Sequence, residues 1–359
     1  MKKYKKIDFA VLELGKGLCA KKILDGILKF VAKIRKDVLE ERGVAIPNIR
    51  IIKNAKLRPF EYAIKVCGTE AARFELEEDS FLAIDTGDAK GKVEGKTVKE
   101  PAFGMPAFWI SAGVKNKAKK SGYAVVPFER VACVHLQEII TKNLSSAITT
   151  QYVEELMDEI NAENPALTGQ LVVGCGNMSL PVIKNVLRGL LEEDVSVANI
   201  VPILEAISET TGTSNTDIDC LVEKARVAIA SDIITPLIQD NELPAISLSQ
   251  DFSEWLLENK GCLFDKSVSE KTITQIANIV KKNGYTPVIL CPREVRKIAR
   301  TFISEICFFQ GFRFISIEEV TTARKLNDSL CVRCIATVGE GIVPKSEEKL
   351  ENCGDKKIA

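Results

Sequence analysis

The stretch TVKEPAFGMPAFWI, Thr97 to Ile110, holds two prolines, a glycine and three aromatic residues in a chain whose aromatic content is only 6%. Each proline fixes its own backbone and pushes the preceding residue towards an extended conformation, and Gly104 permits a turn. We therefore expect a stiff, irregular loop. Its aromatic side chains, Phe103, Phe108 and Trp109, either pack onto a core or present an apolar surface to a partner. The chemistry of the stretch leaves both possibilities open.

The residues around this stretch predict a small inserted domain. From Asp79 to Lys99 the chain is rich in Asp, Gly, Lys and Thr around a short apolar run, Phe81 to Ile84, which is typical of a strand. A short lysine-rich helix is expected at Ser111 to Ser121 and a strand at Tyr123 to Val126. We assign residues 79–127 to a β-rich insert.

The segments on both sides of the insert predict an α+β domain that the insert interrupts. A helix is expected from Ala20 to Arg42, with apolar residues on one stripe and Gly43 as the stop signal. Ile49 to Gly68 alternates apolar and polar residues around a turn, which indicates two strands, and a third is expected at Ala72 to Leu76. Beyond the insert, Glu129 to Ile148 has the spacing of a helix.

The C-terminal half predicts an all-α part followed by an α/β part. Four helices without intervening strands are expected between Gln151 and Ile234, two of them with capping serines at Ser179 and Ser196. From Ala245 to Val338 strands and helices alternate, which is typical of a sheet sandwiched by helices. The predicted fold class is α/β in the mixed, multi-domain sense. Its parts are a linker (1–8), the first α+β domain (9–78 and 128–147), the insert (79–127), an all-α domain (148–235), an α/β domain (236–340) and a disordered tail (341–359).

Length and composition limit the function classes. A chain of 359 residues exceeds the size of a single core, and 49 basic residues balance 49 acidic ones, so no electrostatic field indicates nucleic acid. Eleven cysteines without regular spacing argue against a disulfide framework and fit a reducing cytoplasm. We find no signal peptide and no apolar run of the roughly 18 residues that a membrane span needs. We expect a cytoplasmic protein.

No motif indicates a cofactor, a metal or catalysis. GKVEGKT, Gly91 to Thr97, ends like a phosphate-binding loop, but that motif needs four residues between its glycines. Only three intervene here. Cys331 and Cys334 lie on a predicted strand that would point them to opposite faces, so they would not hold one metal ion. His135, the sole histidine, has no nucleophile motif beside it and is expected to be a packed or interface residue.

Several segments resemble, in order, the cytoplasmic domain of the FHIPEP family, the FlhA-type export-gate proteins of flagella and type III secretion systems. The likeness extends from about residue 9 to residue 235 and is weaker beyond it. The segments that carry it are ELGKGL (Glu13–Leu18), IRKDVLEERGVAIPNIRI (Ile34–Ile51), LRPFEYAIKVCG (Leu57–Gly68), TVKEPAFGMPAFWI (Thr97–Ile110), GYAVVPFERVACVHLQEII (Gly122–Ile140) and VLRGLLEEDVSVANIVPILEAI (Val186–Ile207).

This resemblance implies a docking platform without enzymatic activity. In the family, copies of the domain form a nonameric ring beneath the secretion channel and receive export chaperones with their substrates. The family's docking pocket corresponds here to Glu100, Phe103 and Val134, where Val134 replaces a threonine and so lacks its hydroxyl. Pro101 lies on the rim of the same pocket. Two further residues, Val126 and Val131, are inferred to line it.

The chain departs from the family pattern at Thr149–Tyr152 and at Val197–Asn199, where charged residues are replaced. The departures bring the usual contacts of the all-α domain into question. The membrane region of the family is also absent from this sequence, which is expected of an excised domain or of a soluble paralogue without a membrane anchor. As one alternative, such a paralogue would regulate the export apparatus or act as its adaptor. A second alternative is a small-molecule enzyme in the C-terminal α/β domain.

Overall fold

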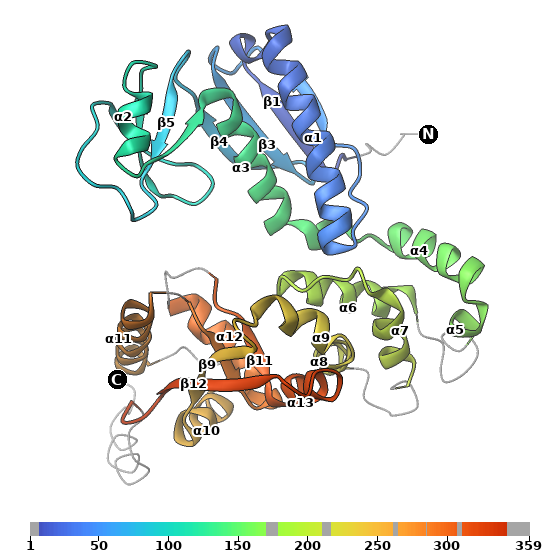
Figure 1. Cartoon of the computed structure of the whole chain (residues 1–359). Coiled ribbons are helices and arrows are strands. Elements are labelled where there is room, and N and C mark those ends of the chain that lie inside the picture. Colours follow the sequence, from blue (N-terminus) through green and yellow to red (C-terminus); the bar gives the residue numbers. More distant parts are fainter. Residues whose placement is uncertain are drawn as a thin grey trace, which may run out of the picture. The chain divides into compact units, whose positions relative to one another are not determined.

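The computed structural model describes residues 7–169, 179–209, 217–260, 265–284, 286–306 and 311–342. The chain forms two compact units, residues 1–222 and 223–359 (Figure 1). Three four-stranded sheets and their helices confirm the predicted mixed α/β fold class. The boundary between the units falls within the predicted all-α domain, and the finer division into domains stays a prediction.

The first sheet has the strand order β2-β1-β3-β4. It contains β1 (Ala10–Leu14), β2 (Arg50–Lys53), β3 (Glu61–Val66) and β4 (Thr69–Glu75). The three predicted strands are present, but the sequence analysis missed β1. This strand lies between β2, which is parallel to it, and β3, which is antiparallel, so the two strands flanking the predicted turn are not neighbours. A strand as short as β1 is stabilised by its partners on both sides rather than by a local pattern.

Two helices cover one face of this sheet (Figure 1). Helix α1 (Lys21–Arg42) follows a 3-10 turn, η1 (Lys16–Cys19), and packs against α3 (Phe128–Lys142), which a second 3-10 turn, η2 (Leu144–Ala147), extends. As predicted, α1 ends at Gly43, whose φ of 71° lies in the left-handed region that glycine tolerates best. Its apolar stripe is buried.

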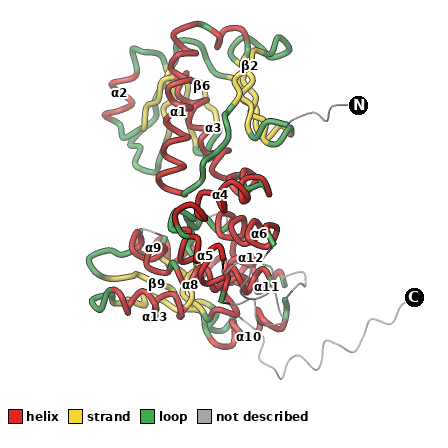
Figure 2. Tube along the Cα trace, turned by 90° about the vertical axis from the view of Figure 1, so that its right-hand side faces the viewer, coloured by secondary structure: helices red, strands yellow, loops and turns green. Residues whose placement is uncertain are grey.

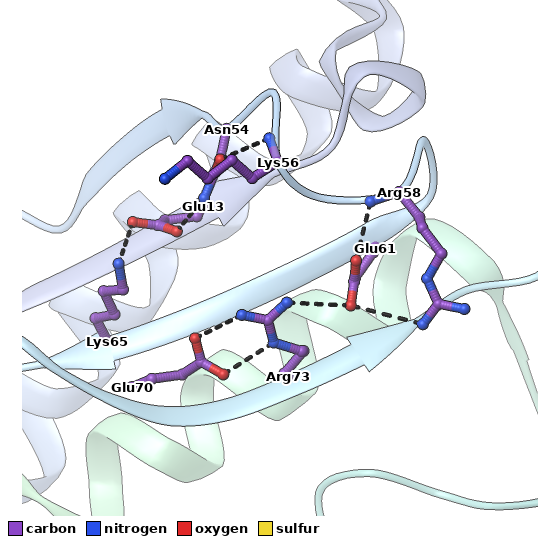
Figure 3. Close-up of polar contacts among 8 residues, drawn as sticks. All are labelled: Glu13, Asn54, Lys56, Arg58, Glu61, Lys65, Glu70 and Arg73. Carbon is purple, nitrogen blue, oxygen red and sulfur yellow. Dashed lines mark hydrogen bonds and ion pairs between the residues drawn. The ribbon is translucent and has the colours of Figure 1, made fainter.

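An ion-pair network occupies the opposite face of the sheet (Figure 3). Glu13 accepts hydrogen bonds from Lys65 Nζ at 2.6 Å and from Asn54 Nδ2 at 2.7 Å. Burial raises the pKa of Glu13, but these bonds outweigh it and hold that pKa below its ordinary value. Glu61 also has a lowered pKa, chiefly because the backbone N–H of Arg58 donates to its carboxylate at 2.9 Å. The network satisfies the buried carboxylates of Glu13 and Glu61 on the face opposite to α1 and α3.

The insert forms its own antiparallel sheet in the order β6-β7-β5-β8. Its strands are β5 (Phe81–Ile84), β6 (Lys96–Lys99), β7 (Pro106–Ile110) and β8 (Ala124–Pro127), and α2 (Lys115–Lys120) packs on them. The opening stretch is therefore mostly strand, because β6 and β7 pair as a hairpin. Only Glu100 to Met105 is the expected stiff turn.

A series of helices follows α3. The helices that complete the first unit are α4 (Thr150–Glu163), α5 (Pro165–Gly169), α6 (Leu180–Glu192) and α7 (Ile200–Ser208), and α8 (Ile218–Ala228) runs across the unit boundary. Ser179 precedes α6 as predicted, although its side chain accepts no capping bond. The prediction for Ser196 was wrong: α7 begins four residues later, and the Ser196 hydroxyl accepts from the N–H of Ala198 instead.

The second unit is a parallel sheet between two helical layers (Figure 2). Its strands β9 (Glu242–Leu248), β10 (Val288–Cys291), β11 (Phe314–Ser316) and β12 (Cys331–Val338) have the order β11-β10-β9-β12. Helices α10 (Gln250–Glu258), α11 (Lys266–Asn283) and α12 (Arg293–Ile306) share one core with the sheet. Helices α9 (Ala230–Ile234) and α13 (Ile317–Leu326) share a second, and the 3-10 turn η4 (Thr235–Leu237) follows α9.

Two predictions for this unit need correction. The helix expected over Ile218–Ile234 is interrupted at Ile229, which separates α8 from α9. Helix α13 was not predicted, although its capping box, formed by Ser316 and Glu319, is a signal in the sequence. The predicted tail lies almost wholly outside the described residues.

Candidate functional site

The turn between β6 and β7 is held by its own backbone. The N–H of Glu100 donates to the carbonyl of Met105 at 2.8 Å, and the N–H of Gly104 donates to the carbonyl of Glu100 at 2.9 Å. Gly104 has a φ of 71°, a conformation that costs a residue with a side chain about 1–2 kcal/mol. The glycine is therefore required by the turn.

The side chain of Glu100 lies beneath this turn. Its two carboxylate oxygens accept the N–H groups of Ala102 at 2.8 Å and Phe103 at 2.7 Å, and the residue is 3% exposed. The resemblance implied that Glu100 belongs to the docking pocket itself. Its burial instead gives it the task of fixing the backbone from which the next side chains project.

Phe103 projects from the turn into solvent. It is 48% exposed, and among the residues with a described side chain it is the only aromatic one in the exposed class. Pro101, beside it, is half-buried. Trp109, by contrast, is 5% exposed, and Phe108 packs edge-on against Tyr123 in the core of the insert. Phe103 is thus available to a partner, whereas Phe108 and Trp109 pack in the core.

The three valines of the predicted pocket lie along β8 and α3. Val126 is half-buried on β8, the edge strand of the insert sheet, where it pairs with Leu82. Val134 is half-buried on α3. Val131 is 2% exposed, so it supports the helix from within and has no surface to offer a partner. Helix α3 contacts the insert through β5 and β8.

A buried polar pair connects α3 to the first sheet next to Val134. The hydroxyl of Tyr62, on β3, lies 2.8 Å from Nδ1 of His135, and the rings meet edge to face. Burial raises the pKa of Tyr62 well above its ordinary value, and the negative charge of Glu100 raises it further. Sequence reasoning did not identify Tyr62, whose only local signal is its place on a predicted strand.

The sole histidine of the chain should lower the stability of the fold in mild acid. Burial lowers the pKa of His135 to about 4, and the positive charge of Lys142 adds to this effect. The unfolded chain binds a proton near pH 6.5 that the folded chain binds only near pH 4, so stability falls as the pH falls through this window. We expect this residue to contribute a loss of about 2 kcal/mol between pH 7 and pH 5.

An NMR titration of this one imidazole measures its pKa directly, without an assignment problem. Urea unfolding of wild type and His135→Asn at pH 7 and pH 5 then isolates its contribution to stability. The variant should lose less stability than wild type over this range. Equal losses in both proteins, or an imidazole that titrates near 6.5, would contradict the expectation.

One cavity lies among the described residues of the second unit. A cavity of about 180 Å³ is lined by Pro244, Val288 and Arg313 among others, near the residues where β9, β10 and β11 begin. Parallel α/β sheets place their active sites at the opposite, carboxyl ends of the strands. The described part of the chain contains no cluster of three residues able to hold a metal ion.

Charged residues are buried in this unit, but they pair with one another. Nε of Arg296, on α12, lies 3.1 and 3.0 Å from the carboxylate oxygens of Glu223, on α8. Arg226 forms an ion pair with Glu319 at 2.8 Å and donates to the carbonyl of Phe314 at 3.1 Å. These pairs tie α8 to α12 and α13.

Comparisons with known sequences identify relatives of this chain. The model of the FHIPEP family matches residues 1–325. The flagellar biosynthesis protein FlhA of Borreliella burgdorferi is 31% identical over 314 residues, which are 83% of this chain and 44% of that protein. The chain thus spans less than half the length of this curated relative. No helix within the described ranges has both the length and the hydrophobicity of a membrane span.

Solved structures share the fold at lower sequence identity. The nonameric cytosolic domain of EscV, from a type III secretion system, superposes with a TM-score of 0.68 at 19% identity and covers 93% of this chain and 97% of its own. CdsV of Chlamydia pneumoniae, solved in complex with CdsO, gives a TM-score of 0.72 at 18% identity over 94% of this chain and 99% of its own.

Proposed function

Because the chain belongs to the FHIPEP family, we propose that it is the cytoplasmic part of a protein-export gate. Its role is to receive export chaperones and their substrates at a docking surface formed by Pro101, Phe103, Val126 and Val134. The residues Glu100 and Val131 support this surface from below. The protein acts by binding, without catalysis, in the cytoplasm.

The exposed Phe103 on a rigid turn is the observation that carries this proposal. Covering the exposed apolar surface of an aromatic side chain with a partner is favourable, because it removes that surface from water. Aromatic residues are also enriched among the residues that dominate binding energy. The turn is held by Glu100 and Gly104 before any partner arrives. A surface that is already ordered loses less conformational entropy on binding.

The second contact at this surface is apolar. Val134 has the shape of threonine but no hydroxyl, so a hydrogen bond from this position is impossible. Val126 is also aliphatic and half-buried. The proposed docking surface therefore selects a partner by shape and apolar contact around the phenylalanine ring.

Assembly into a ring is the second part of the proposal. The EscV cytosolic domain, which shares this fold, is nonameric, and CdsV binds CdsO. Two contacts within the first unit concern the segments that depart from the family pattern. Thr149 caps α4 by accepting the N–H of Tyr152 at 3.1 Å, and the N–H of Val197 donates to the carbonyl of Arg42 at 3.0 Å. Both segments thus make defined contacts without the replaced charges.

Truncation of the exposed ring tests the docking surface. We expect Phe103→Ala to weaken the binding of an export chaperone from the same cell by about 2 kcal/mol, close to thirtyfold, because the central apolar contact is lost. Isothermal titration calorimetry with each purified chaperone measures this change. Thermal unfolding should be nearly unaffected, since the side chain already faces water.

Leu257→Ala is the matched control for this experiment. Leu257 is 43% exposed on α10 and is not one of the docking residues, so Leu257→Ala removes a similar amount of exposed apolar surface. The control should bind as wild type does. Equal chaperone affinity in wild type and Phe103→Ala would refute the docking surface, and no binding of any chaperone by wild type would refute the function.

A further inference from the structure

The tyrosine–histidine pair beneath α3 is conspicuous because it is polar in an otherwise apolar layer. Tyr62 is 0% exposed and His135 is 5% exposed, and the neighbours of His135 that face inwards on α3 include Val131 and Leu136. A pair of apolar side chains of similar size would fill this space with comparable stability. A hydrogen bond differs from such packing in one respect, since it fixes distance and direction.

The pair lies next to Val134, one of the residues of the proposed docking surface. His135 directly follows Val134 on α3, and Tyr62 stands on β3, the strand on which α3 packs. The turn that carries Phe103 joins β6 to β7, and β7 pairs with β5, one of the two insert strands that α3 contacts. The helix that the pair anchors thus contacts the sheet from which the turn projects.

We propose that Tyr62 and His135 are positioning residues of the docking surface, which set Val134 on α3 at a fixed place relative to Phe103 on the turn. This inference rests on the proposed function. Neither side chain touches a partner, because both are buried. Their hydrogen bond holds α3 in one register against β3. Without it, the contact of α3 with β3 would rest on apolar side chains, which tolerate small shifts along the sheet. The N–H of Phe128, at the start of α3, would still donate to the carbonyl of Ser80 at 3.2 Å.

Tyr62→Phe in the full chain is the first test, because it removes the hydroxyl and keeps the ring. Tyr123→Phe is the matched control: Tyr123 is also buried, and its hydroxyl donates to the carbonyl of Gly91 at 2.9 Å within the insert. Chaperone affinity should fall about fivefold in Tyr62→Phe, as expected from one lost hydrogen bond, and should change less than twofold in the control.

A double variant separates positioning from stability. Tyr62→Phe with His135→Leu leaves no unsatisfied nitrogen, so its melting temperature should return towards wild type. If the pair positions the surface, chaperone affinity stays low in this double variant. Recovery of affinity together with the melting temperature would mean that the pair only stabilises the fold, and equal affinities of Tyr62→Phe and Tyr123→Phe would overturn the proposal as well.

A measurement on the chain alone, without a chaperone, distinguishes failure of the positioning role from failure of the docking function. In ¹H–¹⁵N spectra of the chain alone, Tyr62→Phe should shift the amide resonances of Val134 and Phe103, whereas Tyr123→Phe should leave both in place. Unshifted resonances refute the positioning role even when a chaperone binds. Shifted resonances in a protein that binds no chaperone support the positioning and refute the docking function instead.

Discussion

Replacing Arg296 by methionine is expected to destabilise the C-terminal unit by about 3–5 kcal/mol, because the substitution leaves a buried carboxylate without its cation. The Arg296 side chain is fully buried, and its guanidinium binds Glu223 through two nitrogens. Methionine fills a similar volume, so the loss comes from the uncompensated charge of Glu223 rather than from a cavity.

Two control variants identify the cause. The double variant Glu223→Leu with Arg296→Met removes both charges and should regain most of the lost stability, since apolar replacement of a buried ion pair is often neutral. Arg333→Met breaks an exposed pair with Glu242 in the same unit and should cost less than about 1 kcal/mol. A loss in Arg296→Met no larger than that in Arg333→Met would contradict the expected role of the buried pair.

The two tryptophans allow this effect to be assigned to one unit. Trp255 packs against Phe302 in the core of the second unit, and Trp109 lies in the insert. In a Trp109→Phe background, urea unfolding followed by fluorescence therefore reports the second unit alone. All variants of the pair are compared in this background.

Gly43→Ala is expected to destabilise the N-terminal unit by about 2–4 kcal/mol, through backbone strain and a steric clash. Gly43 has a φ of 71°, and a Cβ atom there would lie 2.3 Å from Cα of Ala198. This clash involves backbone, so no side chain can rotate away. The contacts of Arg42 with Asp194 and with the N–H of Val197 surround the same point and would be displaced with it.

Gly26→Ala, in the same helix, provides a control of opposite sign. A Cβ atom at Gly26 meets nothing within 4 Å, and alanine is favoured over glycine in a helix interior by about 1 kcal/mol. Thermal unfolding followed by circular dichroism should thus show a higher midpoint for Gly26→Ala and a lower one for Gly43→Ala. A shift of the same sign in both would show that α1 responds to alanine by propensity alone.

The elements that the sequence predicted well are those with a local signal. Helix α1 has a periodic stripe over many residues and a glycine stop, so its bounds are set by interactions three or four residues apart. The resemblance to the FHIPEP family likewise depends on motifs in their order along the chain, and the family match confirmed it. Strand β1 is only five residues long and has no comparable local signal. It is stabilised by pairing with two neighbouring strands, β2 and β3.

The proposed docking surface divides in the same way. A stiff turn at Pro101 and Gly104, with Phe103 between them, could be predicted from the residues alone, because these residues restrict or free their own backbone. Two features became evident only from the fold: Glu100 faces inwards, and Tyr62 meets His135 across 73 positions of sequence. Burial and hydrogen bonding depend on what lies opposite in space, and a local pattern does not contain that information.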